Sequence, residues 1–236
     1  MSGAHQASDA YERVRRNELR LLDDDIVRGL PATGATTVHA AEWRVRERTM
    51  RRVLRIAGTR PRSILEVGCG NGWLSAHLAA AGHKVSGLDT GATELAQAAR
   101  VFNDRNITWL HGDPWADALT GQHFHLILFA ASIQYFQDLH ALLNRCRDLL
   151  HHEGEVLIVD SPFYTDSDAA HRAYERSRAY YASVNVPEMA AHYHHHTIEQ
   201  LAEATSGAAL TRIPPRGRLE ALLRGRYPFP IVRIRY

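Results

Sequence analysis

The sequence has little cysteine, almost no lysine and no long apolar run. Cys69 and Cys146 are its only two thiols, too few for a disulfide framework, and this indicates a reducing compartment. No apolar stretch approaches the roughly 20 residues that a membrane-spanning helix needs. Residues 5–20 are polar and charged, unlike a signal peptide. We therefore expect a cytoplasmic protein that does not enter a membrane.

The sequence also lacks a large excess of charge of either sign. Its 28 basic residues, of which only Lys84 is a lysine, face 26 acidic ones, so we expect no nucleic-acid partner. An arginine-rich stretch near the end could attract RNA or an anionic substrate. Leucines and Glu220 interrupt that stretch, however, which favours an ordinary helix and strand. Its arginines are Arg212, Arg216, Arg218, Arg224 and Arg226.

What the sequence does contain is an ordered series of strand and helix patterns. Apolar residues at helical spacing predict N-terminal helices over 11–30 and 41–57, with a turn or loop over 31–37. Short apolar runs then alternate with helical patterns, which predicts βαβ units and a mostly parallel sheet. The predicted strands cover 63–67, 84–88, 106–110, 125–130 and 155–159, the last after a Glu153-Gly154 turn, and the helices cover 73–81, 92–102 and 139–150.

The alternation stops after Asp160. Residues 162–196 are predicted to be an insertion with one helix over 168–183, and a helix over 197–205 follows, with Thr197 and Gln200 at capping-box spacing. Two late strands, 209–213 and 230–236, suit an antiparallel hairpin at the sheet edge. Pro228 and Pro230 weaken the prediction of the last strand.

A glycine-rich segment, Glu66-Val-Gly-Cys-Gly-Asn-Gly72, follows the first strand and opens a helix. Its three glycines allow positive φ and let a ligand touch bare backbone at the carboxyl edge of the sheet. The N-terminal amides of the helix can also meet an anionic group. A dinucleotide motif would need glycine at position 73, where Trp73 would obstruct a pyrophosphate.

The same segment resembles the first motif, E/D-x-G-x-G-x-G, of the class I S-adenosylmethionine-dependent methyltransferases. This resemblance implies an enzyme of that kind with S-adenosyl-L-methionine as its cofactor, whose methionine part would meet the backbone of residues 68–72. Glu66 would organise the turn or reach the cofactor amino group through water. A tight turn without a ligand is the alternative interpretation.

Two acids extend the resemblance. Asp89 ends the second strand and could accept hydrogen bonds from both ribose hydroxyls, although it could instead cap the next helix, as Thr90 could equally well. Asp113 would accept the adenine amino group, with Pro114 or Trp115 on the ring face, or it would serve only the local turn. The predicted cofactor residues are Glu66, Gly68, Cys69, Gly70, Asn71, Trp73, Asp89, Thr90, Gly112, Asp113, Pro114, Ala130, Ala131, Ser132 and Tyr135.

The family also implies a fold: α/β, with a Rossmann-like, seven-stranded, mostly parallel sheet, an antiparallel C-terminal strand and helices on both faces. We expect one methyltransferase domain with four parts. These are an N-terminal helical cap (1–60), a cofactor-binding core (61–161), a lid insertion (162–196), and a C-terminal helix with strands (197–236). His125 stands where the family commonly has Asp, at the amino end of its strand and away from the cofactor.

The acceptor side of the site is predicted from residue types alone. His194 and His195 are candidate general bases because histidine titrates near neutral pH, although a solvated loop is the alternative for them. Trp43, Gln134, Tyr164 and Tyr181 are candidate substrate contacts, and Arg44 or Arg48 could meet a carboxylate. We predict no metal, since no Cys, Asp or Glu accompanies residues 192–196 at ligand spacing.

These observations favour methyl transfer to an O, N or C atom of a small molecule, plausibly in specialised metabolism. RNA or protein methylation is the first alternative, and it is weakened because Ala130-Ala-Ser-Ile133 replaces an N-P-P-Y-type motif. The second alternative is a cofactor-binding protein that has lost methyl transfer or uses the sulfonium otherwise. The sequence indicates neither the acceptor nor the oligomeric state.

Overall fold

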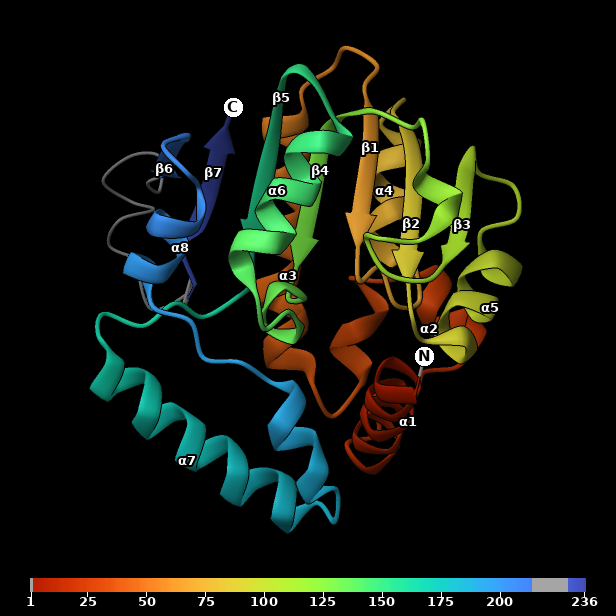
Figure 1. Ribbon diagram of the computed structural model, residues 1–236. Helices are drawn as coiled ribbons and strands as arrows, with labels where there is room; N and C mark the ends of the chain where they lie inside the picture. The colour runs from red at the N-terminus through yellow and green to blue at the C-terminus, as the bar shows by residue number, and fades with distance from the viewer. Residues whose placement is uncertain (1, 214–228) are drawn as a thin grey trace, which may run out of the picture.

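A central sheet organises the molecule, which was analysed as a computed structural model that describes residues 2–213 and 229–236 (Figure 1). The strand order is β3-β2-β1-β4-β5-β7-β6. Strands β1 to β5 pair in parallel, and β7 is antiparallel to both of its neighbours. This confirms the predicted seven-stranded, mostly parallel fold. The strands are β1 Ser63–Val67, β2 Lys84–Asp89, β3 Ile107–His111, β4 Phe124–Ala130, β5 Leu150–Val159, β6 Ala209–Ile213 and β7 Ile231–Arg235.

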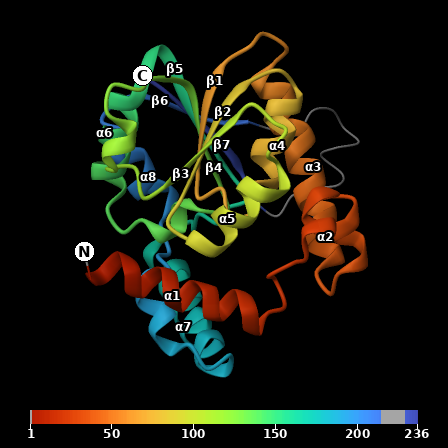
Figure 2. The ribbon, with the colours of Figure 1, turned by 90° about the vertical axis from the view of Figure 1, so that its right-hand side faces the viewer.

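Helices cover both faces of this sheet (Figure 2). On β4, Leu126 and Leu128 pack toward one helix layer while Ile127 and Phe129 pack toward the other, which is why this strand is apolar throughout. One layer contains α2 Asp24–Arg28, α3 Ala40–Ala57, α4 Trp73–Ala80 and α5 Ala92–Val101, and the other contains α6 Leu139–Leu149 and α8 Ile198–Ala204. Short 3₁₀ turns are Thr33–Thr36, Asp117–Leu119 and Ile133–Tyr135.

Two further helices lie beyond the carboxyl ends of the parallel strands, below the sheet in Figure 1: α1 (Ser2–Asn17) and α7 (Ser167–Ser183). A small apolar cluster joins α1 to the lid segment, residues 162–196, which also holds the 3₁₀ turn Pro187–His192. Its buried members are Ala10, Val14, Tyr181, Val186, Met189 and Ala190. Together α1 and the lid segment form a roof over this edge of the sheet.

The structure corrects two sequence predictions. The helix predicted over 11–30 is two helices, α1 and α2, because the chain turns at Leu19, whose φ is 56°. The Glu153-Gly154 turn before the fifth strand is instead a bulge within β5. Phe124 pairs with Leu150 but Leu126 pairs with Glu155, so the extra residues are accommodated inside one long strand.

One further local prediction is confirmed. Thr197 and Gln200 form the expected reciprocal capping box at the start of α8. Arg212 lies in β6, whereas Arg216, Arg218, Arg224 and Arg226 lie outside the described residues. Within the part of the chain that the structure describes, no helix is both long and apolar enough to cross a membrane.

Candidate functional site

Three adjacent cavities lie between the carboxyl edge of the sheet and the roof. We name them by one lining residue each: the Asp89 cavity of about 280 Å³, the Glu66 cavity of about 60 Å³ and the Gln134 cavity of about 430 Å³. Tyr11 and Ala131 line all three. A ligand in one cavity would therefore lie next to a ligand in another.

The glycine turn forms the floor between the first two cavities. Gly68, Gly70 and Gly72 have φ of 76°, 52° and 75°. This is the left-handed conformation that the glycine motif predicts. The N–H groups of Gly68 and Cys69 both donate to the carbonyl of Leu88, at 2.8 and 3.1 Å. The turn is thereby tied to the end of β2.

Glu66 lies beneath this turn and is buried. Its carboxylate accepts a hydrogen bond from the hydroxyl of Ser75 at 2.5 Å. Burial raises the pKa of Glu66 to about 8, and the nearby Asp89 adds to this shift while the Ser75 bond opposes it. Glu66 thus joins β1 to α4 as a carboxyl that holds its proton at neutral pH.

The raised pKa of Glu66 predicts a pH-dependent stability. Between pH 4.5, the ordinary value, and 8 the unfolded chain loses this proton while the folded chain keeps it, so stability falls as pH rises. The slope is at most about 1.4 kcal/mol per pH unit. Glu66→Gln keeps an oxygen for Ser75 but cannot ionise, so the variant should gain stability over the parent as pH rises. Urea unfolding at pH 5 and pH 8 measures this, and a stability difference that is equal at both pH values contradicts it.

Two carboxylates line the Asp89 cavity, and Asp89 is the one that the glycine turn holds in place. Asp89 accepts hydrogen bonds from the N–H groups of Gly70 and Gly91, each at 2.7 Å and each on a different oxygen. Burial raises the pKa of Asp89, which these bonds partly oppose. Asp113, on the same cavity, accepts from the N–H of Trp115 at 2.9 Å. Each oxygen of Asp89 keeps a second lone pair with which to meet a ligand hydroxyl.

All the residues predicted to contact the cofactor line one or both of these two cavities. The Glu66 cavity is lined by Glu66, Cys69, Asn71, Trp73 and Ala130, the Asp89 cavity by Asp89, Thr90, Gly112, Asp113, Pro114, Ser132 and Tyr135, and both by Gly68, Gly70 and Ala131. The structure therefore brings the predicted set together at one edge of the sheet.

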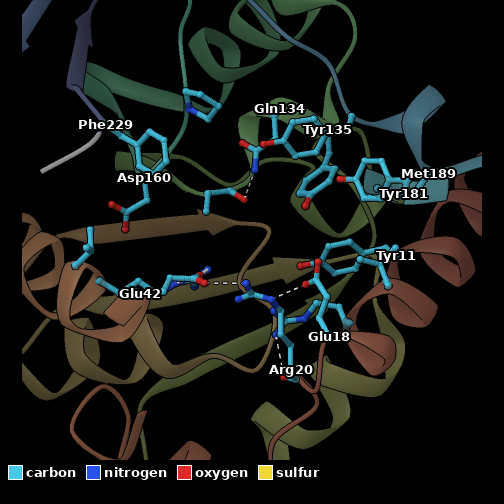
Figure 3. A pocket seen from close by; sticks show the side chains of 17 residues that line it. Tyr11, Glu18, Arg20, Glu42, Gln134, Tyr135, Asp160, Tyr181, Met189 and Phe229 are labelled. Atoms are coloured by element: carbon cyan, nitrogen blue, oxygen red, sulfur yellow. Dashed lines mark hydrogen bonds and ion pairs between the residues drawn. The ribbon is translucent and has the colours of Figure 1, made fainter. Parts of the chain in front are cut away.

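The Gln134 cavity has an aromatic wall and a charged wall (Figure 3). Tyr135 makes edge-to-face contacts with Tyr11 and Tyr193, at centroid distances of 5.3 and 5.7 Å, and Tyr181 lies beside Tyr193. Across the cavity, Arg20 pairs with Glu18 at 2.5 Å and with Glu42 at 2.8 Å, and Arg46 also pairs with Glu42. Although burial opposes it, these arginines lower the pKa of Glu42 to about 2.

The predicted acceptor residues divide into two groups. Gln134 and Tyr181 line the Gln134 cavity, and Trp43 lines the Glu66 cavity, where it packs edge-to-face on Trp73 at 5.5 Å. Tyr164 lines none of the three cavities; it packs against the ring of His195 at 5.7 Å.

His194 and His195 also lie outside the linings of the three cavities. His194 donates its backbone N–H to the carbonyl of Gln134 at 2.7 Å, and the ring of His195 is 2.9 Å from the hydroxyl of Ser177. Burial lowers the pKa of His195 to about 4. These positions give no support to either histidine as the base, which stays a prediction. No group of metal-ligating side chains occurs among the described residues.

Sequence reasoning missed several lining residues. Arg46, rather than Arg44 or Arg48, reaches the cavities, where its guanidinium also lies 5.2 Å from the ring of Trp43. The missed residues Tyr11, Arg15 and Asp160 line both the Glu66 and the Gln134 cavities. Asp160 could have been found, because it directly follows β5 at the sheet edge where Asp89 ends β2.

Comparisons with known proteins agree with this arrangement. Residues 64–154 match a family described as "Methyltransferase domain". An uncharacterized methyltransferase of Mycobacterium tuberculosis is 31% identical over 96 residues, which cover 41% of this chain and 49% of that protein. A ubiquinone biosynthesis O-methyltransferase of Erwinia tasmaniensis is 32% identical over 100 residues, or 40% of each chain. This chain thus spans about half, or less, of the length of these curated relatives.

Solved structures share the fold. An S-adenosylmethionine dependent methyltransferase from Mesorhizobium loti superposes with a TM-score of 0.59 at 20% identity, covering 84% of this chain and 98% of that one. Geranyl diphosphate C-methyltransferase from Streptomyces coelicolor, in complex with S-adenosyl-L-homocysteine, gives a TM-score of 0.59 at 12% identity, covering 89% and 82%. At these identities the likeness concerns the fold.

Proposed function

We propose that this chain, whose residues 64–154 match a methyltransferase domain, is a class I S-adenosylmethionine-dependent methyltransferase that transfers the methyl group to an O, N or C atom of a small molecule. S-adenosylmethionine is the cofactor of this family. The observation that carries the proposal is the junction of three cavities at Tyr11 and Ala131. It offers a donor site and an acceptor site that lie side by side.

The donor site has a group for each part of the cofactor. Asp89 would accept from the ribose hydroxyls, and Asp113 would accept from the adenine amino group. The backbone of residues 68–72 would meet the methionine part. Arg15 and Arg46, which line the Glu66 cavity, would face its carboxylate. When bound, the cofactor supplies a methyl group on a sulfonium, and the chain positions an acceptor in line with it.

The acceptor site supports a small substrate. The roof of α1 and the lid segment covers a cavity of about 430 Å³, a size in the range of small-molecule sites. An RNA or protein acceptor would need an open surface beside the donor site, whereas α1 and the lid segment lie over this one and contribute Tyr11, Tyr181 and Tyr193 to its lining. A role in specialised metabolism is consistent with such a pocket.

Labelled cofactor tests the proposal. We expect S-adenosyl-L-homocysteine to bind in calorimetry, and methyl-labelled S-adenosylmethionine to transfer its label to a metabolite extract rather than to RNA or protein. Label found only in RNA or protein contradicts the small-molecule acceptor. Binding without transfer to any of the three pools would support a protein that holds the cofactor but does not methylate.

A further inference from the structure

Asp160 stands at the boundary between the Glu66 cavity and the Gln134 cavity and lines both. It follows β5 and has a φ of 51°, a left-handed conformation that costs free energy in a residue with a side chain. The hydroxyl of Thr49 donates to its Oδ1 at 2.7 Å. Thr49 is buried on α3, so this bond holds the carboxylate in one orientation between the two cavities.

The arginines that line these two cavities all form ion pairs with glutamates. Of the arginines lining these two cavities, Arg15 pairs with Glu94, Arg20 with Glu18, and Arg46 with Glu42. Asp160 has no ion pair among the residues that the structure describes. It is therefore the surplus negative charge of the combined cavity. Because a buried carboxylate without a cationic partner is costly, and Asp160 has only the Thr49 hydroxyl, the site favours a ligand that brings a positive charge or a further proton donor.

The aromatic wall is suited to the same kind of ligand. Tyr11, Tyr135, Tyr181 and Tyr193 form a continuous set of ring contacts. Figure 3 shows Tyr11, Tyr135 and Tyr181 on the side of the cavity away from Asp160, and Phe229 also lines this cavity. Faces of such rings attract cations and pack on flat apolar groups. A carboxylate substrate, by contrast, would add a second negative charge near Asp160, and the cofactor carboxylate would already face Arg15 and Arg46.

We infer that the acceptor is an amine carried on an aromatic body, that it binds as an ammonium ion, and that its nitrogen meets Asp160, which takes up the proton that the nitrogen must lose before methylation. This inference rests on the proposed function. In the step, one N–H proton of the ammonium passes to the Asp160 carboxylate, which frees the nitrogen lone pair. That lone pair forms the new N–CH₃ bond while the S–CH₃ bond breaks and its electrons stay on sulfur. Ammonium, sulfonium and carboxylate become methylammonium, neutral thioether and neutral acid, so the net charge is unchanged. Burial, which raises the pKa of Asp160, favours this acceptance of a proton.

Binding to the protein saturated with S-adenosyl-L-homocysteine tests the class of acceptor. Phenethylamine, 2-phenylethanol and phenylacetate have nearly the same shape but carry a cation, a neutral hydroxyl and an anion. We expect calorimetry to show phenethylamine binding about tenfold more tightly than the other two, the effect of one hydrogen bond to a charged group. Asp160→Asn should abolish this preference, whereas Asp166→Asn, which removes a carboxylate at the start of α7 outside the cavities, should keep it.

Methyl-labelled S-adenosylmethionine tests the proton step with benzylamine, phenethylamine and tryptamine. We expect label in at least one amine, and about 100-fold slower transfer to it with Asp160→Asn. The inference is overturned if none of the amines binds or is labelled, if phenylacetate or 2-phenylethanol binds equally well, or if Asp160→Asn transfers at the parental rate. It is also overturned if that variant mainly loses affinity for S-adenosyl-L-homocysteine, which would make Asp160 a cofactor ligand. Failure of the parent to bind S-adenosyl-L-homocysteine would instead contradict the proposed function.

Discussion

Asp89→Ala is expected to weaken the binding of S-adenosylmethionine about 100-fold, equivalent to about 3 kcal/mol. The substitution removes both acceptors that hold the N–H groups of Gly70 and Gly91. Each buried donor left unpaired costs about 1–3 kcal/mol, and the proposed ribose contacts are lost as well. Calorimetric titration with S-adenosyl-L-homocysteine, which binds without turnover, measures the effect directly.

Two further variants separate the causes. Asp89→Asn keeps one oxygen but turns an NH₂ group toward one of the two N–H donors, so we expect an intermediate loss of about tenfold. Asp113→Asn keeps an acceptor for the N–H of Trp115 and should change affinity less than Asp89→Ala does. If Asp89→Ala remained folded and bound within about threefold of the parent, the donor site would not be organised around Asp89.

The lining of the Asp89 and Glu66 cavities could be predicted from the sequence because local rules place it. Parallel strands end at one edge of the sheet, so the residues after β1, β2, β3 and β4 must meet there. Three glycines at alternate positions then indicate a turn over which a ligand can lie. Neither step requires knowledge of how distant parts of the chain pack.

The lining of the Gln134 cavity could not be predicted in the same way. Tyr11 and Arg15 lie on α1, 79 residues or more from their partners in the core, such as Glu94. Their position depends on the packing of α1 against the lid segment through residues such as Val14 and Met189. Helical periodicity marks Val14 as apolar but does not say what it contacts. His194 and His195 were predicted as bases from their chemistry alone, yet the titratable side chains that line the cavity are tyrosines, arginines and acids.

The chain turn at residue 19 shows the same limit at smaller scale. The apolar spacing over 11–30 fitted one helix. In the structure, however, α1 packs against the lid segment as part of the roof, while α2 packs beside α5. Asp24 pairs with Arg100 at 2.7 Å and holds α2 at that place. Tertiary contacts of this kind outweigh local periodicity.

Gly72→Ala is expected to destabilise the fold by about 2–5 kcal/mol. Gly72 has a φ of 75°, where a side chain costs about 1–2 kcal/mol. A Cβ there would also lie 2.3 Å from the ring of Trp109 and 2.8 Å from the Cβ of Ala98, so β3 and α5 would have to move. Such overpacking adds about 1–3 kcal/mol. Urea unfolding of the parent and the variant measures the loss.

Gly82→Ala is the matched control for this prediction. Gly82 also has a positive φ, 93°, but a Cβ there would meet nothing within 4 Å. Its loss should therefore be only the conformational part, about 1–2 kcal/mol. Equal losses of unfolding free energy in the two variants would mean that the Trp109 side chain moves aside without a cost in free energy. The glycine at position 72 would then serve backbone conformation alone, and the close packing of β3 beneath the turn would not be needed to hold it.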